Sequence, residues 1–488
     1  MTSKIFIPLL FFTFMCIGQE TEFTAALYET YDTYRETTLN KRRIKYEALQ
    51  PLIEEYRNNS KFSVKKVGQS IEGRDLNLIS IGNGAINVFL WSQMHGDEPT
   101  ATQAIFDIFN FLEAEEFLME KDTILSKLTL HFLPMLNPDG AAVYQRRNRL
   151  GIDINRDALA LQSPEGRTLK KVRDSLNADF GFNLHDQSTY YNAERTEKPA
   201  TISYLAPAYN YEKEINEVRA NAMKVIVFMN NIIQKYAPGQ VGRYNDDFEP
   251  RAFGDNIQKW GTSAILIESG GYANDAEKQE IRKLNYVSIL SAIYAIANEN
   301  YKEIPLEDYE KIPENDRKLF DLKIRNATYN LLGKDYLLDL GINRLEVDKE
   351  GSNDFWYSSR IIDQGDLSTY YGYEDLEASG LTIRKGDVYP ETFMNIDALK
   401  KLDIINMLKS GYTYLRIADI PRAFKSSNVP INMIGVDYKL PKFDVEVGKN
   451  PTFLLEKDGT PRYAVINGFL IDLITGSGDF KNAMIYRK

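Results

Sequence analysis

Residues 86–112 join an apolar run directly to an amphipathic stretch, and this restricts the chain to folds that pack helices against a sheet. The apolar run, Val88 to Trp91, has the length and composition of a buried strand. A polar break follows, and then a stripe of apolar side chains at helical spacing: Ala101, Ala104, Ile105, Ile108, Phe109 and Leu112. Proteins of the α/β class place their binding sites at such breaks, at the carboxyl ends of strands. The break contains His95 and Glu98, in a chain with only 3 histidines.

The same pattern recurs along the first three hundred residues. Further strands are predicted at residues 128–136, 180–184 and 263–267, each followed by a polar segment. Helical patterns lie between them, at residues 164–177, 209–236 and 276–299. Residues 62–81 alternate apolar and polar side chains around two glycines, which is typical of a hairpin. Strands alternating with helices predict an α/β fold with a mixed, largely parallel sheet between helices.

The composition and the hydrophobic pattern of the sequence change after about residue 304. Prolines and charged residues at 305–313 indicate a linker. Beyond it, the dipeptides Asp458-Gly459 and Asn467-Gly468 join strand-length runs, which is a strong hairpin signature. The predicted domains are therefore a catalytic domain at residues 19–304 and a smaller, β-richer accessory domain of mixed character at residues 305–488.

The first 18 residues have the features of a secretory signal. Lys4 precedes a short apolar core, and cleavage after Gly18 would leave small residues at the positions that a signal peptidase reads. An N-terminal anchor or a buried helix is the alternative, and a lipoprotein would require Cys16 as the acylated residue. We expect an exported protein, periplasmic or extracellular, whose mature chain contains no cysteine and hence no disulfide.

Composition excludes two classes of partner. The formal net charge of −10 argues against nucleic acid, because proteins that bind a phosphate backbone need a basic surface. No later apolar run approaches 20 residues, so no stable membrane span is expected after signal cleavage. The oligomeric state does not follow from the sequence.

The histidines suggest a metal site. A catalytic zinc site needs three protein ligands and one open position for water. His95 and Glu98 offer two ligands from one loop, and His185, at the end of another strand, offers the third. Asp186 either orients the His185 imidazole as an acceptor or is a solvated loop carboxylate. His131 lies inside an apolar run, and we interpret it as a core or sheet-face residue.

Five motifs in this order resemble the M14 zinc carboxypeptidases: His95-Gly96-Asp97-Glu98, LPMLNPDG, Arg146-Arg147-Asn148 with GIDINRD, NLHD, and Glu268-Ser269-Gly270-Gly271. The resemblance covers about residues 60–300 and is stronger to the cytosolic-carboxypeptidase and murein-peptide branches than to the digestive enzymes. It implies that His95, Glu98 and His185 bind one Zn²⁺ ion and that Glu268 is the general base. The alternative for Glu268 is a carboxylate that stabilises a turn.

The resemblance also suggests residues that bind substrate. It implies that Arg146, nine positions before Asn155, polarises the scissile carbonyl, although the neighbours Arg147 and Arg149 blur this assignment. Asn155 and Arg156 match the pair that holds the substrate's terminal carboxylate, with Asp157 as a residue that orients the arginine.

The family also has a mobile tyrosine some twenty residues before the base. Tyr244 is the candidate for it in this chain, although its context is not a clean match. The determinant of side-chain preference falls at residues 253–258 and is not readable from this sequence.

These assignments predict an exported zinc metallocarboxypeptidase, a hydrolase that removes C-terminal residues from peptides or peptidoglycan-derived substrates. One alternative is a zinc amidase or deacylase that acts on peptidoglycan stem peptides or N-acyl amino acids. The other is a non-catalytic peptide-binding module that retains the pocket.

Overall fold

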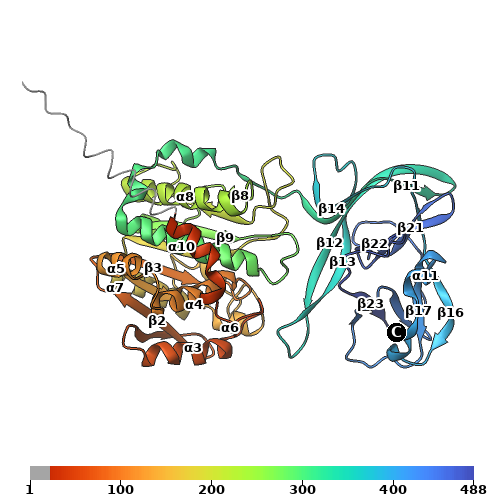
Figure 1. The fold of residues 1–488 in the computed structure, drawn as a ribbon, viewed down its shortest axis with the longest axis horizontal. Helices are drawn as coiled ribbons and strands as arrows, with labels where there is room; N and C mark the ends of the chain where they lie inside the picture. The colour runs from red at the N-terminus through yellow and green to blue at the C-terminus, as the bar shows by residue number, and fades with distance from the viewer. Residues whose placement is uncertain (1–21, 488) are drawn as a thin grey trace, which may run out of the picture. The chain divides into compact units, whose positions relative to one another are not determined.

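The computed structural model describes residues 22–487, so the predicted signal segment at residues 1–18 lies outside the described residues. The chain divides into two compact units, with the boundary between Arg317 and Lys318. Figure 1 shows a first unit in which helices cover a sheet and a second unit built mainly of strands. Among residues 22–487, no helix combines the length and the apolar character that crossing a bilayer requires.

The first unit is organised around an eight-stranded mixed sheet with the order β1-β2-β4-β3-β5-β9-β7-β8. Its four central strands, β4, β3, β5 and β9, are parallel to one another. The strands are β1 (Ser63–Gln69), β2 (Asp75–Gly82), β3 (Ile86–Ser92), β4 (Leu128–Leu133), β5 (Phe180–Asp186), β7 (Ile202–Leu205), β8 (Val241–Arg243) and β9 (Ser263–Ser269). The predicted mixed sheet is confirmed, as is the hairpin, which β1 and β2 form.

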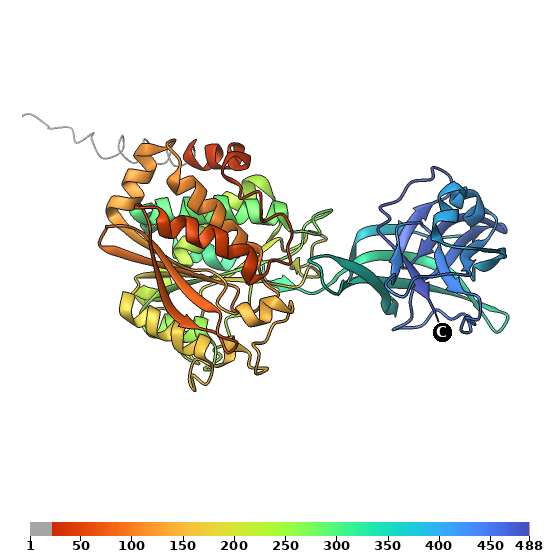
Figure 2. The ribbon, with the colours of Figure 1, turned by 90° about the horizontal axis from the view of Figure 1, so that it is seen from below.

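Both faces of this sheet are buried, because helices cover each of them (Figure 2). Side chains of β3 alternate between two cores: Val88 and Leu90 belong to one, while Phe89 and Trp91 belong to the other. This alternation follows from the two-residue period of a strand. A strand buried on both faces must be apolar throughout, which explains the uninterrupted run in the sequence.

The helices follow the predicted pattern with shifted ends. Besides the helical residues 22–29, the first unit contains, among the described residues, α2 (Tyr31–Tyr34), α3 (Tyr46–Asn58), α4 (Thr100–Glu113), α5 (Leu118–Lys127), α6 (Pro138–Ala142), α7 (Pro164–Leu176), α8 (Glu217–Tyr236), α9 (Phe253–Lys259) and α10 (Gln279–Asn298). Helix α8 begins at Glu217 rather than at residue 209, because the Asn216 side chain accepts a hydrogen bond from Arg219 N and caps the helix there.

Residues 305–316 are part of the first unit rather than a linker. The short 3₁₀ helix η3 (Leu306–Lys311) carries Tyr309, which is fully buried in the main core. The Tyr309 hydroxyl accepts a hydrogen bond of 2.9 Å from the backbone N–H of Ala206. Strand β10 (Asn315–Asp316) then pairs with β6 (Asn192–Ala193). The boundary between the units therefore falls after residue 317 and not after residue 304.

The second unit contains two sheets, in agreement with the predicted β-rich region. The larger sheet comprises β11 (Leu319–Leu331), β12 (Lys334–Asp348), β13 (Phe355–Gly365), β14 (Tyr371–Glu377), β15 (Thr382–Arg384), β20 (Phe453–Lys457), β21 (Thr460–Ile466) and β22 (Phe469–Asp472). The smaller comprises β16 (Asp387–Phe393), β17 (Tyr412–Ile417), β18 (Ser426–Ser427), β19 (Asn432–Gly435) and β23 (Ala483–Tyr486), with helix α11 (Ile404–Lys409) nearby in the chain.

Both predicted hairpins of the second unit are present. Asp458-Gly459 connects β20 to β21, and Asn467-Gly468 connects β21 to β22. All four of these residues have positive φ, between 48° and 76°, as tight hairpin turns of this kind require.

His131 lies in β4, as expected for a sheet residue. Its protonation predicts part of the decrease in the free energy of unfolding at acidic pH. Its Nδ1 is 2.8 Å from Ser80 Oγ and its Nε2 is 3.2 Å from Asn87 Oδ1. Burial, with a smaller contribution from Lys65, lowers the pKa of His131 from 6.5 to about 4. Neutral His131 therefore contributes stability that is fully present above pH 6.5 and is lost as the pH falls towards 4, because the unfolded chain takes up the proton first.

The variant His131→Gln is expected to flatten the decline of the free energy of unfolding between pH 6.5 and 4. The limit for one proton is ~1.4 kcal/mol per pH unit. Urea unfolding at several pH values measures this slope. Equal slopes for the variant and the wild type would show that His131 does not titrate in this way.

Candidate metal centre

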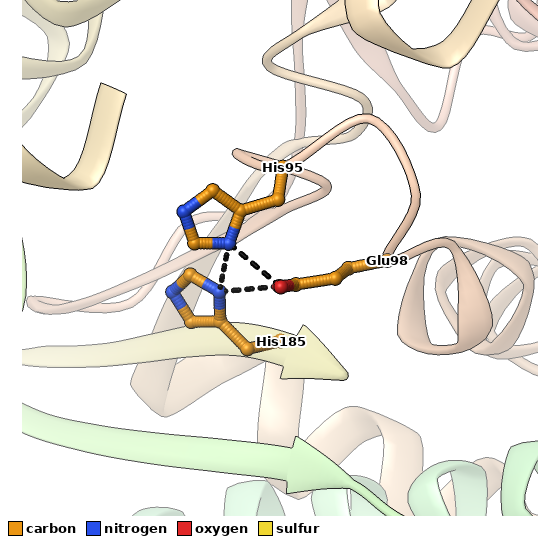
Figure 3. Close-up of side chains that lie close together, drawn as sticks. All are labelled: His95, Glu98 and His185. Carbon is orange, nitrogen blue, oxygen red and sulfur yellow. Dashed lines mark hydrogen bonds and ion pairs between the residues drawn. The ribbon is translucent and has the colours of Figure 1, made fainter. Parts of the chain in front are cut away.

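Two histidines and one glutamate converge at the carboxyl ends of the central strands (Figure 3). His95 and Glu98 lie in the loop between β3 and α4, and His185 lies near the end of β5. Because β3 and β5 are adjacent and parallel, with Ser92 opposite Leu184, the loop after β3 lies beside the end of β5. All three residues are buried, with exposed fractions of 2%, 9% and 2%.

The donor atoms of these residues face one another. His95 Nδ1 is 3.2 Å from His185 Nδ1, and Glu98 oxygens lie 2.8 Å from the first nitrogen and 2.7 Å from the second. A tetrahedral zinc ion with bonds of ~2.0–2.1 Å places two ligand nitrogens about 3.3–3.4 Å apart. The nitrogen separation and the chemistry of the donors, two imidazoles and a carboxylate, therefore fit Zn²⁺. Among the described residues, these three form the group that offers such a site.

Burial and mutual charge set the protonation states. Burial alone would raise the pKa of Glu98, but the two imidazoles outweigh it and hold that pKa well below its usual range. Burial lowers the pKa of His185. Burial also opposes charge on His95, but Glu98 and then Asp153 outweigh it and raise the pKa of His95 to about 9. A metal ion bound here would displace the His95 proton, because metal ligands must be deprotonated.

A carboxylate that the sequence analysis did not single out orients His95. Asp153 Oδ1 lies 3.1 Å from His95 Nε2, the nitrogen that faces away from the other donors. Such a contact selects the tautomer that leaves Nδ1 available to a metal. The sequence offered a signal, since Asp153 lies inside the motif GIDINRD, but nothing local distinguishes it from Asp157.

The sequence left Asp186 either as an acceptor for His185 or as a solvated loop carboxylate, and its side chain instead makes buried contacts to other residues. Asp186 Oδ2 accepts hydrogen bonds from Thr100 Oγ1 at 2.6 Å and from Lys278 Nζ at 3.1 Å. Its backbone N–H donates to Glu98 Oε2 at 3.2 Å. Side chains alternate across a strand, so Asp186 projects away from the face that carries His185.

Glu268 lies beside the donors, on the neighbouring strand. In the parallel pairing of β5 with β9, Glu268 is directly opposite His185, so the two side chains project from the same face. Burial, and then the charge of Glu98, raise the pKa of Glu268 well above its ordinary value. A partly desolvated carboxylate of raised pKa beside a candidate metal site has the properties of a general base.

Of the three neighbouring arginines, the structure brings only Arg146 to the donors. Arg146 Nη1 is 3.1 Å from His95 Nδ1 and 3.2 Å from Glu98 Oε1, and its Nε donates to Asp153 at 3.0 Å. Arg147 instead donates to the carbonyl of Gly151, and Arg149 pairs with Glu72. The guanidinium of Arg146 thus lies against the donor atoms of the candidate metal site. The Arg146 side chain is 43% exposed, so its guanidinium is also accessible to a substrate in solution.

Asn155 and Arg156 lie in a 3₁₀ helix, η1 (Ile154–Arg156), next to α9. The Asn155 side-chain oxygen accepts a hydrogen bond of 3.0 Å from Phe253 N, which ties η1 to the first residue of α9. The Arg156 side chain is 37% exposed, and its Nε is 3.6 Å from Glu249 Oε2. The expected role of Asp157 is wrong, because its carboxylate accepts hydrogen bonds from Gln162 and Ser163 ahead of α7.

Tyr244 is half-buried after β8, where its N–H donates to Tyr204 O at 3.0 Å. Its ring meets that of Tyr191 edge to face, with centroids 5.7 Å apart. Burial and then the charge of Glu268 raise the pKa of the Tyr244 hydroxyl, with a smaller contribution from Glu98. Tyr244 therefore lies within electrostatic reach of the donors and of Glu268. Its partner Tyr191 was not anticipated from the sequence.

Part of this chain is similar in sequence to zinc carboxypeptidases. Residues 46–237 match the sequence model of the zinc carboxypeptidase family. A probable carboxypeptidase 2 from Trichophyton verrucosum is 29% identical over 133 residues, which is 27% of this chain and 24% of that protein. Carboxypeptidase SOL1 from Arabidopsis thaliana is 30% identical over 99 residues, 19% of this chain and 20% of that protein. The chain thus spans about a quarter or less of the length of these relatives.

Among solved structures, a metallo-carboxypeptidase from Burkholderia cenocepacia is similar over 53% of this chain and 70% of its own, with 16% identity and a TM-score of 0.43.

Proposed function

Since residues 46–237 match the sequence model of the zinc carboxypeptidase family, we propose that this protein is a zinc-dependent metallocarboxypeptidase that hydrolyses the C-terminal peptide bond of peptides. The observation that carries the proposal is the convergence of His95, Glu98 and His185, with Glu268 directly opposite His185 on the adjacent strand. Three donors leave one coordination position open, as hydrolytic zinc sites require.

In the proposed mechanism, His95, Glu98 and His185 hold the zinc, which supplies Lewis-acid activation of water and of the scissile carbonyl when bound. Glu268 accepts a proton from the attacking water and delivers it to the leaving amine. Burial raises the pKa of Glu268, which makes its carboxylate a better proton acceptor than an ordinary solvated glutamate.

Arg146 and Arg156 are proposed to hold two groups of the substrate: the carbonyl of the scissile bond, on the penultimate residue, and the carboxylate of the last residue. Arg146, which is half-exposed beside the donors, directs its guanidinium at the oxygen of the scissile carbonyl and stabilises the charge that develops there. Arg156, with Asn155, binds the terminal carboxylate, and Tyr244 closes on the substrate from the side of Glu268.

The test of this proposal is product analysis by mass spectrometry. The zinc-loaded protein is incubated with free peptides, the same peptides amidated at the C-terminus, muropeptides and N-acyl amino acids. Stepwise loss of single C-terminal residues from the free peptides alone is expected. Release of acyl groups without loss of amino acids would indicate the amidase or deacylase instead, and binding without any product would indicate the non-catalytic module.

Export is proposed from residues 1–18, with peptides or peptidoglycan fragments outside the cytoplasm as substrates. The support is the charged start, apolar core and small residues of that segment. N-terminal sequencing of the protein from the exported fraction should begin at Gln19, and recovery of the unprocessed chain would contradict this.

Arg156→Gln is expected to raise KM for free peptides by about 10–100-fold and to change kcat little, because a charge-assisted hydrogen bond is worth roughly 1.5–3 kcal/mol and holds the carboxylate throughout the reaction. Steady-state kinetics measures both constants. Arg147→Gln is the matched control, because Arg147 contacts Gly151 and not the donors. Equal KM for the Arg156 variant and the wild type would remove Arg156 from the binding site.

A further inference from the structure

Lys278, immediately before α10, is a buried cation next to the candidate metal centre. Only 3% of its surface is exposed. Its ammonium donates to Asp186 Oδ2 at 3.1 Å, to the carbonyl of Ser269 at 2.8 Å and to the carbonyl of Gln187 at 3.5 Å. Three acceptors match the three N–H donors of an ammonium group, so the charge is compensated within the protein.

Each of these contacts lies one or two residues from a residue of the site. Asp186 follows His185 as the last residue of β5, Gln187 comes directly after that strand, and Ser269 follows Glu268 on β9. A single ammonium thus connects the ends of the two strands that carry a metal ligand and the general base.

Asp186 extends the connection to Glu98. The Asp186 oxygen that binds Lys278 also accepts a hydrogen bond of 2.6 Å from Thr100 Oγ1, two residues after Glu98. The Asp186 backbone N–H donates directly to Glu98 Oε2 at 3.2 Å. The loop that carries Glu98 is therefore held against the end of β5 by the same carboxylate.

Local structure does not favour a lysine at this position. Lys278 has φ of 52°, in the left-handed region that costs energy for a residue with a Cβ. It also places a positive charge at the N-terminus of the 20-residue helix α10, where the helix dipole disfavours cations. Burial of the ammonium adds a desolvation cost. What offsets these costs is the set of contacts to the ends of β5 and β9.

We propose that Lys278 is a positioning residue. Its contacts hold the metal ligands His185 and Glu98, and the general base Glu268, in the relative placement that metal binding and hydrolysis require. The inference rests on the proposed function, but zinc affinity measured without turnover tests it separately.

The experiment compares Lys278→Met, Asp186→Asn, the double variant and wild type. Methionine keeps most of the length of the lysine side chain without its charge. Zinc dissociation constants are measured by competition with a chromogenic chelator, and Tm is measured for the metal-free proteins. Lys283→Met is the matched control, because it removes the same charge from α10 at a residue that lies over the ring of Tyr28.

Lys278→Met is expected to weaken zinc binding about 10–100-fold, the range for residues that support metal ligands. It should also lower Tm, since it leaves the Asp186 carboxylate buried without its cation. The double variant should regain Tm but keep the weak zinc binding, because neutrality returns while the connection between strands does not. Lys283→Met should bind zinc as wild type does.

Wild-type zinc affinity in the double variant would overturn the inference, since Lys278 would then only neutralise Asp186. This result is distinct from failure of the proposed function, which would appear as wild-type protein that binds zinc tightly and hydrolyses no peptide. Wild-type affinity in Lys278→Met itself would also overturn the inference.

Discussion

Glu268→Gln is expected to lower kcat by about 10²–10⁴-fold, the usual contribution of a general base, while zinc stays bound. The amide has nearly the shape of the carboxylate but does not accept a proton from water at neutral pH. The carboxylate is not among the three donors, so the ligand set of His95, Glu98 and His185 remains complete. Steady-state kinetics and metal analysis of the purified variant measure the two quantities.

The control for this prediction is Glu280→Gln, the same chemical change on α10, where Glu280 accepts a hydrogen bond from the Tyr28 hydroxyl. That variant should retain wild-type kcat and zinc content. Undiminished hydrolysis by Glu268→Gln would exclude Glu268 as the base and leave a turn-stabilising role for it. Loss of zinc together with activity would place Glu268 among the ligands.

Removal of the metal is expected to abolish peptide hydrolysis, and zinc is expected to restore it and raise Tm. A ligand that binds only the folded protein stabilises it by ~4 kcal/mol at a thousand times its dissociation constant. His185→Gln should lose both effects, because it deletes one of the three buried donor residues, whose Nδ1 lies 3.2 Å from His95 Nδ1. Thermal unfolding with and without added zinc measures the stabilisation, and peptide hydrolysis measures recovery.

The matched variant is His131→Gln. It alters the remaining histidine, which lies in β4 between Ser80 and Asn87 and not in the donor group. Its Tm should rise with zinc as that of the wild type does. If His185→Gln were stabilised by zinc to the same extent, the metal would bind elsewhere and the proposed centre would be wrong.

The fold was predictable to a large extent because its signals are local. The apolar run Val88 to Trp91 specifies a strand buried on both faces, and alternation with helices specifies the class of sheet. The prediction from sequence was wrong where contacts between distant residues determine the structure. Residues 305–316 contain prolines and charges, yet Tyr309 fills the main core and binds Ala206, about a hundred residues earlier.

Within the site, too, some contacts follow from short spacing in the sequence and others depend on the pairing of distant strands. His95 and Glu98 are three residues apart, so their proximity follows from the chain itself, whereas the approach of His185 depends on β5 pairing with β3. The sequence left open whether Asp186 contacts an imidazole and did not single out Asp153, because aspartates of the same type are equally plausible. Strand alternation turns Asp186 towards Thr100 and Lys278, while the turn before η1 brings Asp153 to His95.

By itself, the sequence determined the class of sheet and the residue types available for a metal, since periodicity and short spacings are properties of neighbouring residues. Only the tertiary structure decided that Arg146 rather than Arg147 or Arg149 meets the donors, and that Lys278 connects two strand ends. The contacts of Arg146 with His95 and of Lys278 with Asp186 join residues that are 51 and 92 positions apart in the chain. They depend on side-chain direction and on packing between strands, which neighbouring residues in the sequence do not determine.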